Sequence, residues 1–217
     1  MKKVLLIATT ALALAAGSAI ADDKNRITKT YDLDGFDEID VSGVYDIDVT
    51  VGEDFSFEIS GPAKEMERVE FETRKGVLHL GHRERKRNEK KIRNRKGLDA
   101  RITLPVLYAI SVSGVVDADI TGVTAENFDF NLSGVGDVDL SGSCGSLKAK
   151  ISGVGDFDAR SFKCSTVDVS VSGVGDAEVF AKDAVKANAS GMGDISVYGK
   201  PGDVEANDSF LSDITIH

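Results

Sequence analysis

Residues 131–158 read NLSGVGDVDLSGSCGSLKAKISGVGDFD, and this stretch contains the pentapeptide Ser-Gly-Val-Gly-Asp twice. The two copies start at Ser133 and Ser152. An identical copy and two close variants start at Ser172, Ser113 and Ser190. Successive starts in this series of five are 20, 19, 20 and 18 residues apart. A period of this length fits a stacked solenoid, in which each repeat lies against the next.

Apolar and polar residues alternate on both sides of each Gly-x-Gly corner, which is the pattern of strands that bury one face. The residues predicted to point inward before the corners are Phe128, Phe130 and Leu132; Leu147, Ala149 and Ile151; Val167, Val169 and Val171; and Val185, Ala187 and Ala189. We therefore expect an all-β fold, a parallel β-helix or solenoid of stacked rungs of 18–20 residues. Six rungs would span about 25 to 30 Å. A β-sandwich is the alternative architecture.

Two columns of outward residues support parallel, in-register stacking by an independent route. The first column alternates in sign down the stack and consists of Asp129, Lys148, Asp168, Lys186 and Glu205. The second is rich in amides and consists of Ser111, Asn131, Lys150, Ser170, Asn188 and Asn207. Neighbours about 4.8 Å apart would form ion pairs in the first column and hydrogen bonds along the second.

Cys144 and Cys164 are the only cysteines, and they lie 11 and 12 residues after Ser133 and Ser152. Stacked rungs would bring their Cα atoms to about 4.8 Å, inside the range that a disulfide bridges. In an oxidising compartment we expect the two to be bonded. Two free buried thiols are the alternative, and a metal site is disfavoured because no histidine lies near them in the sequence.

The N-terminus has the pattern of a secretory signal. Lys2 and Lys3 precede an apolar run over 4–16, and 19–21 supply the small residues that a signal peptidase reads. We expect residues 1–21 to be removed and the chain to be exported to the periplasm, the outer-membrane surface or the extracellular space. No later segment is long and apolar enough to span a membrane. The net charge of -10 disfavours binding to nucleic acid.

The first half of the mature chain, residues 22–104, is less regular than the repeat array at 105–217. Its strand-like runs are 38–51, 55–60, 69–73, 77–81 and 98–104, with one helical turn expected over 62–68. One extra copy of the motif, Ser-Gly-Val-Tyr-Asp at 42–46, stands alone in this half. We expect both halves to form one continuous solenoid domain.

A basic loop is predicted at 81–97, where nine Lys and Arg accompany two Glu. The basic residues are Arg83, Arg85, Lys86, Arg87, Lys90, Lys91, Arg93, Arg95 and Lys96. A charge run of this kind is usually a solvated loop. Its functional interpretation is binding of anionic glycans or lipopolysaccharide phosphates. The absence of interleaved aromatic residues again disfavours nucleic acid.

The Ser-Gly-x-Gly-Asp copies, the Ile-Thr-Leu-Pro at 102–105 and the strand pair at 36–51 together resemble a bacterial family called putative auto-transporter adhesin, head GIN domain. The resemblance covers about residues 32–213. It implies an exported β-solenoid with an adhesive role and supplies no catalytic residues. The copy at Ser113 lacks the second glycine, and the degenerate copy at 209–213 reads Ser-Phe-Leu-Ser-Asp. These departures predict that both are terminal rungs acting as caps.

Two acidic columns follow the corners. The first consists of Asp117, Asp137, Asp156, Asp176, Asp194 and Asp213, and the second of Asp119, Asp139, Asp158 and Glu178. Like carboxylates at this spacing repel one another, so we expect hydrogen bonds to corner N–H groups, bound cations or raised pKa values. Hydrogen bonding is the preferred interpretation of the first column. The candidate cation or ligand face is Asp137, Asp139, Asp156, Asp158, Asp176 and Glu178, with calcium as the candidate ion.

Three functions compete. A non-enzymatic envelope or surface interaction module, which would bind an envelope polysaccharide or a surface protein, is preferred because solenoids present long ladders to extended ligands. The second is a calcium-assisted polysaccharide lyase with Arg160 as the base, although no long inserted loop is present to build a cleft. The third is a structural scaffold. No Ser/His/Asp or Cys/His set is evident, so we expect no enzyme activity and no cofactor other than calcium.

Overall fold

The computed structural model describes residues 26–83 and 97–217, and these residues are almost entirely β-structure. They form 15 strands in one hydrogen-bonded sheet and one short helix, α1 (Ala63–Met66). The all-β prediction is confirmed. The strands of the first half are β1 (Arg26–Tyr31), β2 (Glu38–Ser42), β3 (Val44–Val51), β4 (Ser56–Pro62), β5 (Val69–Arg74), β6 (Val77–His82) and β7 (Leu98–Leu104).

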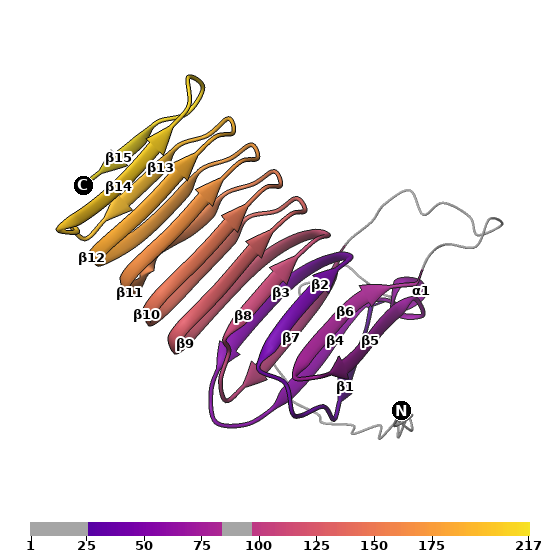
Figure 1. The fold of residues 1–217 in the computed structure, drawn as a ribbon. Coiled ribbons are helices and arrows are strands. Elements are labelled where there is room, and N and C mark those ends of the chain that lie inside the picture. Colours follow the sequence, from indigo (N-terminus) through magenta and orange to yellow (C-terminus); the bar gives the residue numbers. More distant parts are fainter. Residues whose placement is uncertain (1–25, 84–96) are drawn as a thin grey trace, which may run out of the picture.

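The strands of the second half are β8 (Ala109–Val112), β9 (Val115–Leu132), β10 (Val138–Ile151), β11 (Phe157–Val171), β12 (Ala177–Ala189), β13 (Ile195–Tyr198), β14 (Asp203–Asp208) and β15 (Ile214–Ile216). The sheet runs from β1 at one end to β15 at the other and is not closed. Figure 1 shows the strands of the second half side by side, coloured from magenta to yellow.

Strands β9 to β12 pair in parallel, each with the equivalent strand of the next copy. Lys148 lies between Asp129 and Asp168, as the sign-alternating column predicted. Further along this column, Lys186 Nζ is 3.0 Å from Glu205 Oε1. In the amide column, Asn207 Nδ2 donates to Asn188 Oδ1 at 3.2 Å. The predicted parallel, in-register pairing is confirmed.

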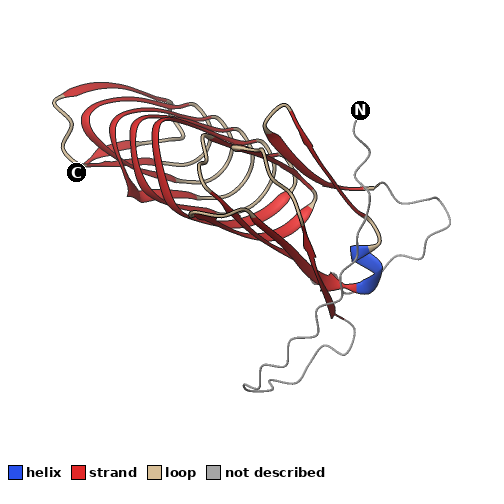
Figure 2. Ribbon diagram, turned by 90° about the horizontal axis from the view of Figure 1, so that it is seen from below, coloured by secondary structure: helices blue, strands red, loops and turns tan. Residues whose placement is uncertain are grey.

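The residues predicted to point inward fill the interior between the strands. Leu132, Ile151 and Val171 lie in register and are at most 1% exposed. Aromatic rings pack between copies, since the ring centroids of Phe130 and Phe157 are 4.2 Å apart. Figure 2 shows the strands and loops of successive copies curving round this shared interior. The predicted inward and outward assignment is therefore confirmed.

The glycines of the corners are required because the backbones of neighbouring copies touch. A Cβ on Gly153 would collide with the carbonyl oxygen of Gly134 in the preceding copy. Gly155 has a φ of 138°, which side chains rarely adopt, and a Cβ there would meet the carbonyl oxygen of Gly136. The backbone therefore continues its hydrogen bonds through the corner, with Val154 N–H donating to Gly134 O at 3.0 Å.

The disulfide joins neighbouring copies as predicted. Cys144 on β10 pairs in register with Cys164 on β11, and the two are bonded. Their Cα atoms are 4.4 Å apart, and both side chains are buried.

The first half of the chain joins the sheet in an order that differs from its order in the sequence. Strand β3 lies between β7 and β9, so the motif copy at 42–46 stacks directly on the copy at Ser113. The expectation that the copy at Ser113 is a terminal cap is therefore wrong. Its departure from the motif has another cause, because Val116 fills interior space and is fully buried.

The remaining strands of the first half include antiparallel pairs, namely β1 with β4, β4 with β7 and β5 with β6. Tyr31, Phe57 and Phe71 pack together there, with ring centroids 4.5 Å apart for Tyr31 and Phe71 and 5.2 Å apart for Phe57 and Phe71. The helical turn expected over 62–68 is present as α1. No helix among the described residues has the length and hydrophobicity to cross a bilayer.

Candidate functional site on the outer face

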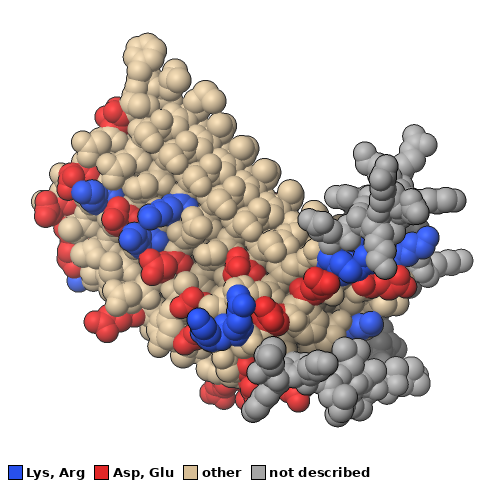
Figure 3. Space-filling view, turned by 45° about the vertical axis from the view of Figure 1, so that its right-hand side comes forward, with Lys and Arg blue, Asp and Glu red and all other residues tan. Residues whose placement is uncertain are grey.

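Charged side chains gather on part of the surface and leave a broad area free of charge. In Figure 3 the blue and red side chains lie intermixed over the lower part of the face shown, and the upper part is tan. The two predicted acidic columns differ in how their carboxylates are satisfied, and this difference locates the candidate site.

The first acidic column is a hydrogen-bond ladder between carboxylates and backbone. Asp156 N–H donates to Asp137 Oδ1 at 2.9 Å, and Asp176 N–H donates to Asp156 Oδ1 at 2.9 Å. The ladder continues with Asp194 N–H to Asp176 Oδ1 at 2.8 Å and Asp213 N–H to Asp194 Oδ1 at 2.9 Å. The preferred interpretation of this column, hydrogen bonding to corner N–H groups, is confirmed.

The ladder engages half of the candidate calcium face, whose role in binding a cation stays a prediction. Asp137, Asp156 and Asp176, three of the six candidate ligands, already accept hydrogen bonds from the backbone. Across residues 26–83 and 97–217, no group of three or more His, Cys, Asp or Glu side chains is arranged to hold a metal ion.

The second acidic column meets a cation at its C-terminal end. Arg160 Nε lies 3.0 Å from Asp158 Oδ2 and 2.6 Å from Glu178 Oε2, so one guanidinium joins the carboxylates of two copies. Hydrogen bonds from Arg160 hold the pKa of Asp158 below its ordinary value. Asp139, one copy earlier, has a raised pKa because of burial and because Asp119 and Asp158 lie beside it.

An aromatic column lies next to Arg160. Phe180 on β12 neighbours Tyr198 on β13, and His217 stacks on Tyr198 with ring centroids 4.6 Å apart and planes 13° apart. Lys163 Nζ lies 3.9 Å from the centroid of the Phe180 ring, a cation–π contact, and also donates to the carbonyl oxygen of Arg160 at 2.6 Å. Rings and cations thus share one surface.

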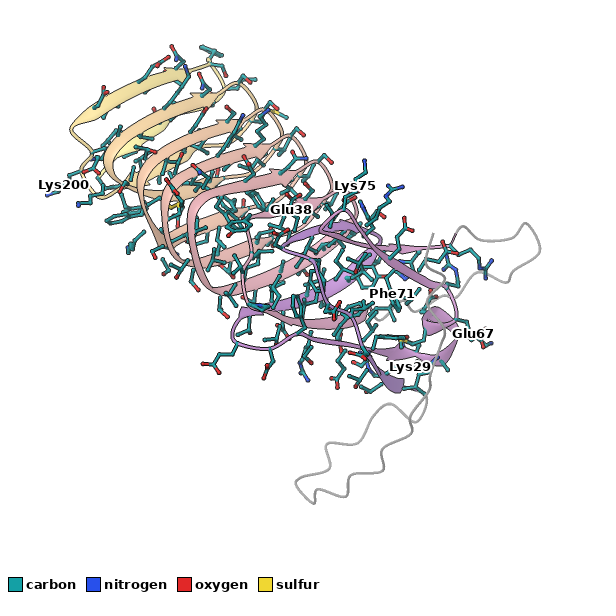
Figure 4. All side chains as sticks on the ribbon, turned by 60° about the horizontal axis from the view of Figure 1, so that its bottom comes forward. Lys29, Glu38, Glu67, Phe71, Lys75 and Lys200 are labelled. Atoms are coloured by element: carbon teal, nitrogen blue, oxygen red, sulfur yellow. A yellow bond between two sulfur atoms is a disulfide. The ribbon has the colours of Figure 1, made fainter. Side chains whose placement is uncertain are left out.

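These side chains line a surface pocket of about 450 Å³, which we call the Tyr198 pocket. It is formed by Arg160, Lys163, Phe180, Tyr198, Gly199, Lys200 and His217. The turn after β13 shapes its rim, since Gly199 and Lys200 have positive φ values of 102° and 56°. Figure 4 shows Lys200 projecting outward from this turn at the C-terminal end of the stack.

The aromatic column was missed in the sequence, although a signal for it exists. Phe180, Tyr198 and His217 each lie four residues after the corner aspartate of their copy, and Arg160 holds the same offset one copy earlier. Alignment of the repeats at this offset would have shown the column.

The predicted basic loop lies for the most part outside the described residues. Residues 84–96 are not described, so eight of its nine basic residues, all except Arg83, stay a prediction. The backbone carbonyl of Arg83 accepts a hydrogen bond from Arg68 Nη2 at 2.8 Å.

The comparisons with known proteins agree with this architecture. Residues 35–201 match the family described as "Putative auto-transporter adhesin, head GIN domain". The chain belongs to this family. A comparison of the head GIN chain with the curated proteins gives no match.

Solved structures resemble this head GIN chain over most of its length. One is a putative adhesin of Bacteroides fragilis NCTC 9343, with 27% sequence identity and a TM-score of 0.74 over 90% of this chain and 98% of that one. A putative adhesin of Parabacteroides distasonis ATCC 8503 shares the fold at 20% identity and a TM-score of 0.52, covering 90% and 98%. A protein of the same strain described as a putative lipid binding protein shares it at 16% identity and a TM-score of 0.52, covering 88% and 97%.

Proposed function

We propose that this head GIN chain is an exported, non-enzymatic surface interaction module that binds a polysaccharide in the Tyr198 pocket. The observation that carries the proposal is the stacked aromatic column beside an arginine that joins two carboxylates. The family description and the adhesin name of the similar Bacteroides fragilis protein support a surface interaction role.

The proposed architecture is a β-solenoid. The parallel pairing of equivalent residues from copy to copy and the shared apolar interior support it. A stack of this kind presents each outward position as a straight column, with one side chain per copy. A polymer that lies along the stack would therefore meet the same chemistry at regular intervals.

The chemistry of the pocket suits a sugar. The apolar face of a pyranose ring can pack on Tyr198 and Phe180, because aromatic side chains offer flat apolar area with little entropy to lose. Arg160, Asp158 and Glu178 can donate to or accept from the hydroxyls of the sugar. Lys163 and Lys200 favour a sugar that carries a carboxylate or a phosphate.

Export and the absence of catalysis belong to the same proposal. The expected signal peptide at 1–21 lies outside the described residues, and the disulfide between Cys144 and Cys164 supports an oxidising compartment outside the cytoplasm. The lyase alternative needs Arg160 to act as a base. Its hydrogen bond to Asp158 raises the pKa of Arg160, which works against loss of its proton.

Binding to a carboxylated polymer and to a neutral one tests the proposal. We expect affinity electrophoresis to show retardation by polygalacturonate and little by dextran. The Tyr198→Ala variant should lose at least about tenfold in affinity, which corresponds to about 1.4 kcal/mol. Tyr108→Ala is the matched control, because Tyr108 is a 45% exposed tyrosine that lies outside the pocket. The proposal would be overturned if polygalacturonate retarded the two variants equally. It would also be overturned if polygalacturonate retarded neither the variants nor the parent chain.

A further inference from the structure

A second surface feature is independent of the Tyr198 pocket. The residue after each Ser-Gly points outward, and these residues form a row that we call the valine ladder: Val115, Val135, Val154, Val174 and Met192. Their exposed fractions lie between 42% and 54%. Each pairs with the next in parallel register, and Val44 of the early copy continues the row beyond Val115.

The ladder lines a groove of about 1050 Å³ together with the serines and glycines of the motif copies. Gly134, Gly153 and Gly173 line it without side chains, and a Cβ on any of them would collide with the preceding copy. The motif serines are exposed in the groove, and Ser152 Oγ donates along the stack to Leu132 O of the preceding copy at 3.4 Å. In Figure 3 the broad tan area carries regular rows of uncharged residues.

Charge is confined to one end of the groove. Glu65 and Arg68 are the only acidic or basic side chains, histidine aside, in its described lining, and both belong to the first half of the chain. Leu211, which is 63% exposed, lines the groove as well, and the adjacent Phe210 is fully exposed. The five ladder residues together with Val44 span about 24 Å at strand spacing. A monomer rarely exposes a continuous apolar strip of this kind without a partner for it.

We propose that the valine ladder is the interface between two copies of this chain, packed face to face about a two-fold axis. The net charge of -10 makes two copies repel through most of their surfaces, and the ladder lets them meet where the one acidic side chain in the described groove lining, Glu65, is paired with Arg68. A row of near-identical side chains at constant spacing is complementary to the same row running in the opposite direction.

The same symmetry brings the two ends of the groove together. In an antiparallel pair, the Phe210 and Leu211 tip of one copy lies over the Arg68 end of the other. Arg68 there is 15% exposed and pairs with Glu65 at 3.0 Å, so the Phe210 ring of the partner would pack against this ion pair. The strip is narrow, so the interface belongs to the small class and the dimer dissociates readily on dilution.

Sedimentation equilibrium of the full chain, up to about 0.5 mM, tests this proposal, since a weak dimer has a dissociation constant in that range. We expect a reversible monomer–dimer equilibrium that shifts toward dimer as salt screens the repulsion between the copies. Val154→Lys should raise the dissociation constant at least tenfold, because each lysine would be buried against the partner. Phe210→Ala should raise it by a smaller factor.

Val106→Lys is the matched control, because Val106 is a 36% exposed valine in the loop between β7 and β8, outside the groove. It should leave the dissociation constant unchanged. Unchanged melting temperatures would show that both variants fold. A chain that stays monomeric at all concentrations would overturn the proposal, as would equal effects of Val154→Lys and Val106→Lys. A bound small molecule found in the monomer by native mass spectrometry would assign the groove to that ligand instead.

Discussion

The second half of the chain and the first half continue the same column of aspartates but satisfy it in different ways. From Asp137 to Asp213, each backbone N–H in the column donates to the carboxylate of the copy before it. In the first half, Asp46 lies between Asp99 and Asp117 on paired strands, and Arg26 binds Asp99. In the repeats, the backbone N–H of one copy donates to the aspartate carboxylate of the copy before it. In the irregular half, the carboxylate of Asp99 is instead bound by a side chain, Arg26.

The largest expected effect breaks the interior of the regular half. Ile151→Asp should lower the free energy of unfolding by about 4 kcal/mol, because it buries a carboxylate with no partner. The same substitution at the neighbouring outward residue, Lys150→Asp, should change it little. Urea unfolding measures both. Similar losses for the two variants would contradict the inward and outward assignment.

Removal of the disulfide tests how far the regular half depends on a covalent link between copies. The double variant Cys144→Ala, Cys164→Ala should lose about 3 kcal/mol, the entropy of closing a loop of about 20 residues in the unfolded chain. Reduction of the parent chain should give a similar loss in the same unfolding experiment. If neither treatment lowers the stability, the pair carries no such constraint.

A pair of glycine substitutions compares the two halves directly. Gly153→Ala places a methyl group against the backbone of the preceding copy and should cost about 2 kcal/mol or more. Gly52→Ala in the first half meets the Thr103 Cγ2 atom at 3.3 Å, a side chain that can shift, and should cost less than about 1 kcal/mol. Thermal melting measures both losses of stability. A larger loss for Gly52→Ala than for Gly153→Ala would contradict the prediction.

The aspartate ladder itself predicts a smaller effect. Asp156→Ala leaves the N–H of Asp176 without its acceptor and should cost about 1 kcal/mol. Asp156→Asn keeps an oxygen in place and should recover most of that loss. An alanine variant as stable as the parent chain would mean that water replaces the carboxylate at no cost.

The smallest expected effect is a pair of opposite pH dependences. Burial and the neighbouring Asp99 and Asp117 raise the pKa of Asp46 above its unfolded value, so its stabilising contribution is present in acid and is lost as pH rises through the folded pKa. The pKa of Asp158 is lowered, chiefly by its hydrogen bond from Arg160, so its contribution is present above the unfolded pKa and is lost as pH falls through the folded pKa.

At neutral pH, Asp46→Asn should therefore stabilise the chain and Asp158→Asn should destabilise it. Each change should be less than about 1 kcal/mol, because both side chains are partly exposed to solvent. Both differences should fade below about pH 4. Melting curves from pH 3 to pH 7 give the comparison, and changes of the same sign at neutral pH would contradict it.

The regular half could be predicted from the sequence because two periods act together there. Alternation of apolar residues assigns each side chain to a face, and the 18–20-residue repeat assigns it a neighbour in the next copy. The pairing of Lys148 with Asp129 and Asp168 and the bond between Cys144 and Cys164 both follow from these two rules.

The insertion of β3 between β7 and β9 could not be predicted in the same way. Its motif copy at 42–46 precedes its neighbour at Ser113 by 71 residues, and alternation within a strand carries no information about which strand lies beside it. The valine ladder was missed for a different reason. Its residues lie at the corners, where the apolar–polar alternation of the strands stops. The pattern therefore does not predict whether their side chains point inward or outward.

The contacts between glycine backbones have a consequence for how chains of this design change in length. Each copy pairs its strands with the copies on either side, so a whole repeat is the unit by which the stack could lengthen or shorten. Each gain would move the Tyr198 pocket about 4.8 Å further from β1. The number of repeats then sets the distance between β1 and the pocket. Evolution could change that distance in steps of one strand spacing while the residues of the pocket stay the same.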